Sequence, residues 1–347
     1  MTDVGKTPFI KELASSDKKL RDKATNSLTL FLRAKTDLSN LDLLKLWKGL
    51  FFCFYHSDRP LTQQALARTL SYNLVPTLPR PTLHKFLRAF WLTIGRDFHS
   101  IDRLRLDKYL FLIRCYVGVA FEVFLKGNGT STQPSGNDAT ADGKKRKREE
   151  ESTNSSNKKG GKKRKGKGQQ QQQQQQPQEE EEQQQDGEVD LAALESYLAI
   201  LEEGPLCPLN FDPDQPPANE AEDFIPMPHG PDGLRYHVMD IWVDELEKVL
   251  EFEEVTTAGE EGTTIRKPKG LQVPPELLLR PLERLSKESP YKPVRVRAAE
   301  ALEDDRLVEW GWKERKVESD SDDDDEEDEE EDEEEDEDAE WGGFGDD

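Results

Sequence analysis

Residues 39–56, SNLDLLKLWKGLFFCFYH, decide the fold class of this chain. Ser39, followed three residues later by Asp42, resembles a capping box that opens a helix. A helix that is apolar on nearly every side is buried between neighbouring elements. The stretch therefore predicts a buried helix from Leu41 to about His56, whose apolar residues are Leu43, Leu44, Leu46, Trp47, Leu50, Phe51, Phe52, Phe54 and Tyr55.

Further helices are predicted on both sides of this stretch. Asp17 ends a polar group that can cap a helix in which Leu20, Ala24, Leu28, Phe31 and Leu32 form one stripe. Proline at the first helical position and serine before it are common start signals. The other helices of the front segment are expected at about Pro8 to Ala14, from Pro60, at Thr82 to Asp97, and at Ile101 to Lys126 after Ser100.

The order of these helices predicts an all-α fold. Short connections make successive helices antiparallel neighbours, and stacked pairs of such helices form a HEAT/armadillo-like helical repeat, an α-solenoid. A closed helical bundle is the alternative, because no clean sequence repeat is visible. No alternation of Val and Ile indicates strands.

The chain divides into four parts by composition. Residues 1–126 are the N-terminal helical repeat domain, and residues 127–187 are a basic and Gln-rich insertion that we expect to be disordered. Residues 188–316 are expected to add further helices to the same scaffold, at Leu191 to Leu201, Gly233 to Val255, Pro275 to Lys287 and Val294 to Leu302, with an extended Pro-rich stretch from Pro205 to Pro231. Residues 317–347 are an acidic C-terminal tail that is predicted to be disordered, because dense like charges repel.

Charge is distributed unevenly along the chain, whose formal net charge is -24. Residues 1–126 hold 21 bases and 11 acids, whereas residues 318–347 hold 22 acids and no base. A basic folded segment suggests a polyanion such as nucleic acid as partner, and a solvated helix surface is the equally weighted alternative. The tail also contains Ser319 and Ser321 before acids, a context for acidophilic kinases, and two isolated aromatic residues, Trp341 and Phe344.

Two basic clusters in the insertion resemble a bipartite nuclear localisation signal. A nonspecific RNA-binding arm is a compatible interpretation, because Lys-rich segments bind phosphate by counterion release. The first cluster is Lys144, Lys145, Arg146, Lys147 and Arg148, and the second is Lys162, Lys163, Arg164 and Lys165.

The folded part has one further group of bases, which are candidate RNA contacts: Arg96, Arg103, Arg105, Lys108 and Arg114. The competing interpretation is that these side chains form ion pairs within their own helix, with Asp102 and Asp107.

Nothing in the sequence indicates catalysis. The five histidines lack metal-ligand spacing, the three cysteines have no paired spacing, and the nucleotide-binding and nucleophile motifs are missing. We therefore expect no catalytic residue, no metal, no cofactor and no small-molecule substrate. No apolar run approaches the roughly 18 residues of a membrane span, so no membrane partner is expected.

Three long strings resemble the ribosomal RNA processing protein 1 family, also called the nucleolar protein 52 family. They are FIKELASSDKKLRDK at residues 9–23, LSNLDLLKLWKGLFFCFYHSDRPL at 38–61 and FLRAFWLTIGRDFHSIDRLRLDKYLFL at 86–112, and PDGLRYHVMDIWVDELEKV at 231–249 is similar to a later family segment. The resemblance implies a non-catalytic protein of the nucleus and nucleolus that is needed for precursor rRNA processing toward the large-subunit rRNAs. It also implies partners: other large-subunit ribosome assembly factors, precursor rRNA within pre-60S particles, and ribosomal proteins.

Two other functions compete with this expectation. An acidic histone chaperone or chromatin adaptor fits the acidic tail and the nuclear signal, and an rRNA nuclease or modifying enzyme fits a nucleolar location. The second would need a metal site or nucleophile, which the sequence does not offer.

Overall fold

The computed structural model describes residues 7–126, 189–256 and 264–314. Most of these residues are helical, which confirms the all-α prediction. The insertion and the acidic tail, for which we predict disorder, lie outside the described residues. The helices of the first segment are α1 (Pro8–Leu13), α2 (Lys18–Ala34), α3 (Asn40–Tyr55), α4 (Pro60–Arg68), α5 (Arg80–Asp97) and α6 (Arg103–Lys126), with a π-helical turn at Thr69–Asn73 and 3-10 turns at Val75–Thr77 and Phe98–Ser100.

The second segment adds shorter helices and one β-hairpin. Its elements are α7 (Leu191–Glu203), α8 (Asp232–Asp240), α9 (Trp242–Val249), β1 (Phe252–Thr256), β2 (Thr264–Pro268), α10 (Pro275–Glu288), α11 (Lys292–Leu302) and α12 (Asp305–Glu309).

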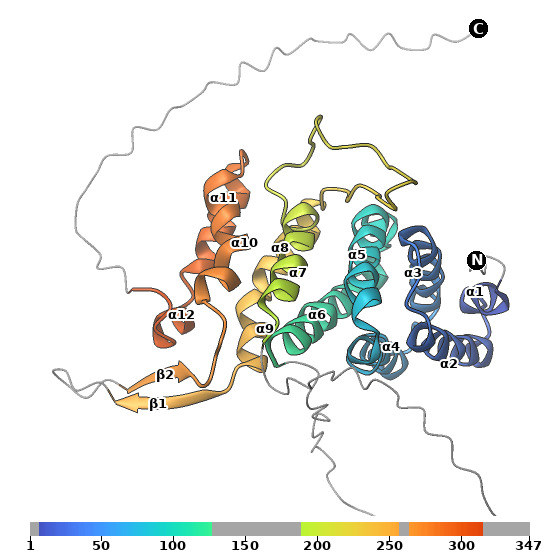
Figure 1. The fold of residues 1–347 in the computed structure, drawn as a ribbon, viewed down its shortest axis with the longest axis horizontal. Coiled ribbons are helices and arrows are strands. Elements are labelled where there is room, and N and C mark those ends of the chain that lie inside the picture. Colours follow the sequence, from blue (N-terminus) through green and yellow to red (C-terminus); the bar gives the residue numbers. More distant parts are fainter. Residues whose placement is uncertain (1–6, 127–188, 257–263, 315–347) are drawn as a thin grey trace, which may run out of the picture.

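The helices form two rows that run along the length of the molecule. In one row α1 contacts α3, α3 contacts α5, α5 contacts α7, and α7 contacts α10. In the other row α4 contacts α6, α6 contacts α8 and α9, and α8 contacts α11. The order therefore progresses from α1 at one end to α11 and α12 at the other (Figure 1). Stacked rows of this kind are expected of a helical-repeat protein, and the HEAT/armadillo-like repeat itself stays a prediction.

Helix α3 occupies the position that its composition predicts. Its first turn is capped by the Ser39 hydroxyl, which accepts a hydrogen bond of 3.1 Å from the Asp42 N–H. Trp47 packs against Phe86, Phe90 and Tyr116, and its indole N–H donates to the carbonyl of Phe86 at 3.0 Å. Burial of each such side chain contributes roughly 1.5–3 kcal/mol, so α3 is the centre of the first segment's core.

The second segment packs onto the first. The Phe124 and Tyr197 rings stack with centroids 5.2 Å apart, and Phe121 meets Trp242 edge to face at 5.0 Å. The buried residues of both segments form one hydrophobic cluster.

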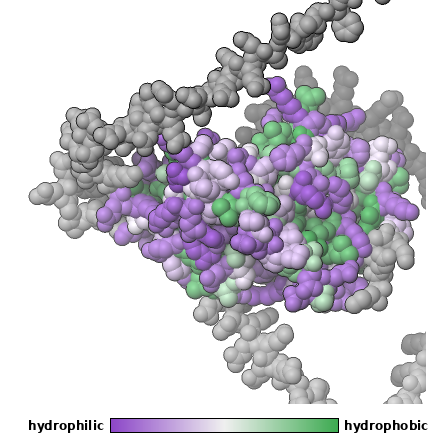
Figure 2. Space-filling view, turned by 90° about the horizontal axis from the view of Figure 1, so that it is seen from above, coloured by the Kyte–Doolittle hydropathy of each residue, from purple (hydrophilic) through white to green (hydrophobic). Residues whose placement is uncertain are grey.

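On the face seen from above, hydrophilic side chains cover most of the surface, with a few hydrophobic patches between them (Figure 2). The division into domains stays a prediction.

Two expectations for residues 233–268 were wrong. The helix predicted from Gly233 to Val255 is broken at Ile241 and ends at Val249, and a β-hairpin follows. In the hairpin Glu253 is opposite Lys267 and Glu254 is opposite Arg266. Such opposite-charge pairs stabilise a sheet only when two strands meet, so the periodicity of either strand alone could not predict the hairpin.

Candidate RNA-contact site

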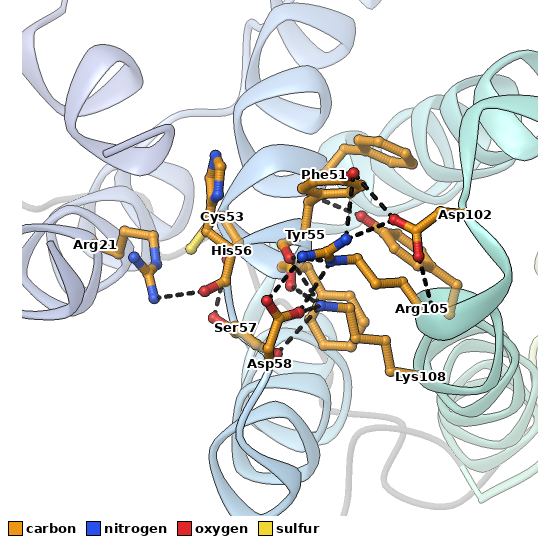
Figure 3. Close-up of polar contacts among 12 residues, drawn as sticks. Arg21, Phe51, Cys53, Tyr55, His56, Ser57, Asp58, Asp102, Arg105 and Lys108 are labelled. Atoms are coloured by element: carbon orange, nitrogen blue, oxygen red, sulfur yellow. Dashed lines mark hydrogen bonds and ion pairs between the residues drawn. The ribbon is translucent and has the colours of Figure 1, made fainter. Parts of the chain in front are cut away.

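The last turn of α3 is where two of the candidate bases meet. The final carbonyls of a helix have no partner inside the helix and form the negative end of its dipole. Here they face three cationic side chains, Arg21 from α2 and Arg105 and Lys108 from α6 (Figure 3). The cluster therefore closes the end of α3 by joining it to helices on both sides.

Lys108 is the buried member of this cluster. Its ammonium donates to the carbonyls of Phe54 at 3.0 Å, Tyr55 at 2.8 Å and Ser57 at 3.2 Å, and to the Asp58 carboxylate at 2.8 Å. Burial lowers the pKa of Lys108, and the hydrogen bond to Asp58 opposes that shift. The ammonium of Lys108 is thus surrounded by oxygens of the protein, which favours a structural role over contact with an RNA phosphate.

Arg105 binds the outer side of the same turn. Its guanidinium bridges Asp58, with nitrogen–oxygen distances of 3.0 and 2.9 Å, and Asp102, at 2.6 Å, and it lies over the Tyr55 ring. Hydrogen bonds from Arg105 and then from Lys108 lower the pKa of Asp58 to about 2. The hydrogen bond from Arg105 likewise lowers the pKa of Asp102. Both carboxylates therefore stay charged and hold Arg105 against α3.

Arg21 was missed by the sequence analysis. It is only 5% exposed, and it donates to the carbonyls of Ser15 at 2.9 Å, Ser16 at 2.8 Å and His56 at 3.1 Å. In the described part of the chain it bonds no carboxylate. A signal was available: Arg21 lies three residues before Ala24 and seven before Leu28, on the apolar stripe of α2.

The other three candidates lie apart from this cluster. Arg114 joins α6 to α9, with ion pairs of 2.6 Å to Asp244 and 2.5 Å to the buried Glu245. Arg96 is exposed and 3.6 Å from Asp97, and Arg103 is exposed with no ion-pair partner among the described residues. The structure thus brings Arg105 and Lys108 together and leaves Arg96 and Arg103 at the surface. RNA contact by any of the five stays a prediction.

The described residues offer no group of three or more His, Cys, Asp or Glu side chains arranged to hold a metal. Cys53 and Cys115 are buried free thiols, and burial raises the pKa of Cys115 to about 11. Over the described ranges, no helix combines the length and the apolar character that crossing a membrane requires.

Comparison with known proteins gives a consistent family. The model of the family described as "Nucleolar protein, Nop52" matches residues 5–136 and 185–344. Human ribosomal RNA processing protein 1 homolog B is 43% identical over 126 residues, which are 35% of this chain and 16% of that protein. Human homolog A is 38% identical over 116 residues, 32% of this chain and 25% of that protein. The Drosophila melanogaster homolog is 31% identical over 126 residues, 35% of this chain and 18% of that protein.

The matched part of the chain spans a quarter or less of the length of these relatives. The family model, in contrast, extends over both helical segments and across the strings that contain α3 and the start of α6. This chain therefore belongs to the Nop52 family of nucleolar proteins.

Proposed function

We propose that the chain is a non-catalytic scaffold of ribosome assembly in the nucleolus, which takes part in processing precursor rRNA toward the large-subunit rRNAs within pre-60S particles. The observation that carries the proposal is the family match over both segments of the two-row helical body. The names of the similar human, mouse and fly proteins, which refer to ribosomal RNA processing, support the same role.

The mechanism that we propose is binding and positioning. A core shared by both segments gives a rigid surface, on which other large-subunit assembly factors, ribosomal proteins and precursor rRNA are held in a fixed arrangement. The basic insertion adds phosphate contacts and raises the local concentration of RNA, because tethered sites bind at a high effective concentration. On the folded body, Arg96 and Arg103 are the candidates that retain an exposed guanidinium for phosphate.

Location is a separate part of the proposal. Residues 144–148 and 162–165 direct the chain to the nucleus, from which binding to precursor particles retains it in the nucleolus. Replacement of both basic clusters by glutamine in a fluorescent fusion is expected to leave the protein outside the nucleus. A nuclear signal that survives the replacement would contradict this assignment.

Depletion and gradient sedimentation test the main proposal. Loss of the protein is expected to cause accumulation of precursors of the large-subunit rRNAs, and the tagged protein is expected to sediment with pre-60S particles. Crosslinking on native particles then identifies the surface that meets RNA. Normal large-subunit rRNA processing after full depletion would overturn the proposal.

The acidic tail is also compatible with an alternative function, that of a histone chaperone, which the experiments must distinguish. Residues 318–347, with 22 acids, also fit a protein that binds basic histones. Purification from nuclease-treated nuclei separates the two functions, because a histone chaperone would retain stoichiometric histones whereas an assembly factor would retain precursor-particle proteins.

A further inference from the structure

An open cleft of about 450 Å³ lies between α2, the end of α3 and α4. Its buried floor is formed by Arg21 and Thr25 of α2, Cys53 of α3 and Ser57, and Figure 3 labels Arg21, Cys53 and Ser57. The wall on α4 includes Leu61, which is 83% exposed. Ala65 and Leu66 continue the apolar surface of this wall.

The lining of the cleft holds two bases, Lys18 and Arg21, and one acid, Asp22. Helix α2 as a whole carries five bases against one acid. Arg21 has five N–H groups and uses three of them for the carbonyls of Ser15, Ser16 and His56. At the rim, the ion pair of Lys18 with Asp22 is half exposed and is therefore weak. A ligand with carboxylates and an apolar side chain could contact both the bases of α2 and the apolar wall on α4.

One segment of this chain has that chemistry. Residues 318–347 contain 22 acids, and their large apolar residues are Trp341 and Phe344, separated by two glycines. The family match continues through this segment to Phe344, so these aromatics belong to the matched family region. Charge complementarity and the aromatic pair together favour this segment over RNA as the ligand, because the phosphate backbone of RNA has no apolar side chain to pack against the wall on α4.

The connection is long enough. Helix α12, which precedes Glu314, lies at the end of the molecule opposite to α2 (Figure 1). Trp341 lies 27 positions after Glu314, and an extended chain of that length spans up to about 90 Å. A folded body of this size has a radius of gyration of roughly 18 Å.

We propose that the segment around Trp341 and Phe344 docks, within the same molecule, in the cleft between α2 and α4. The aromatic rings pack on Leu61 and its neighbours on α4, and the adjoining carboxylates face the bases of α2.

Photocrosslinking in the full chain tests this proposal. A p-benzoylphenylalanine at position 61 is compared with one at position 104, because Leu104 is 94% exposed and lies on α6 outside the cleft. Position 61 is expected to crosslink to residues 335–347 of the same molecule and position 104 is not. Added salt is expected to lower the yield, since exposed charges are screened. Mixing isotope-labelled with unlabelled protein distinguishes a link within one molecule from a link between two.

Matched variants measure the two halves of the contact. A labelled peptide of residues 330–347 is titrated onto the chain truncated after residue 317, which retains the two-row stack. Trp341→Ala with Phe344→Ala in the peptide, or Leu61→Asp in the truncated chain, is expected to weaken binding on the order of tenfold, as for anchor residues at interfaces. Leu104→Asp is expected to have no effect. Equal crosslinking from positions 61 and 104, links only between molecules, or an affinity that ignores the aromatics would each overturn the proposal.

Discussion

The structural role of Lys108 gives the sharpest prediction. Lys108→Met keeps most of the aliphatic stem and removes the ammonium, which leaves the carbonyls of Phe54, Tyr55 and Ser57 without this donor. Each such hydrogen bond contributes roughly 1 kcal/mol. The lost pairing with Asp58 adds little, because that carboxylate is half exposed and keeps its two contacts with Arg105. The expected loss of unfolding free energy is about 3 kcal/mol, at the low end of the 3–5 kcal/mol found when one partner of a buried pair is removed.

Urea and thermal denaturation, followed by circular dichroism, measure this loss. For a folded body of this size, about 3 kcal/mol corresponds to a decrease in Tm of roughly 6–12 °C. Arg103→Met is the matched control: it removes a base from the exposed side of the same helix, and a change within about 0.5 kcal/mol is expected.

RNA binding, measured by fluorescence anisotropy well below both transitions, separates the two roles of these bases. Lys108→Met is expected to leave the affinity for a precursor rRNA fragment unchanged, while Arg103→Met lowers it and reduces the salt slope by about one. A Lys108→Met protein as stable as the wild type, or one that is folded but binds RNA more weakly, would refute the structural role of the ammonium.

Three further predictions concern pH, helix packing and the attachment of α12. The pKa of Asp58 is lowered to about 2 from 3.8. The stabilising contribution of its carboxylate is therefore present above pH 4 and is lost as the pH falls through 2. In urea titrations, the stability difference between wild type and Asp58→Asn should shrink from pH 5 to pH 2, and a difference that is constant with pH would contradict the ion pair. Gly118→Ala places a methyl group 2.6 Å from a carboxylate oxygen of the buried Glu245, so the free energy of unfolding measured by chemical denaturation should fall by about 1–3 kcal/mol. Gly233→Ala is the control, because the nearest atom to its new methyl group is 3.4 Å away, and its stability should be unchanged or higher. Equal effects of the two substitutions would rule out the contact at Gly118. Arg306→Met removes the ion pairs that join α12 to Asp244 and Glu247 of α9, so hydrogen exchange should increase over residues 305–312 with little change in α3, and unchanged protection there would exclude this attachment.

The family and the helical architecture were largely available from the sequence. Helix signals are local. An apolar stripe needs only residues three and four apart, and an N-terminal cap needs a side-chain oxygen that accepts a hydrogen bond from the N–H about three residues later. Ser39 and the stripe of α2 are found where these rules predict them. The strings at residues 38–61 and 86–112 combine such signals into a long pattern, which led to the Nop52 family that the comparison then showed.

The tertiary structure decided which bases are free to act. Arg103, Arg105 and Lys108 lie within six residues on one helix, and composition gives all three the same positive charge. Their environments differ because Asp58 and the last turn of α3, about fifty residues earlier in the chain, pack against one side of α6 and not the other. The partners of Arg114 are more than 100 residues away, and the strands β1 and β2 exist only through pairing with each other. Local periodicity determines that a helix forms, whereas the neighbours of each charge depend on chain reversals that no local pattern encodes.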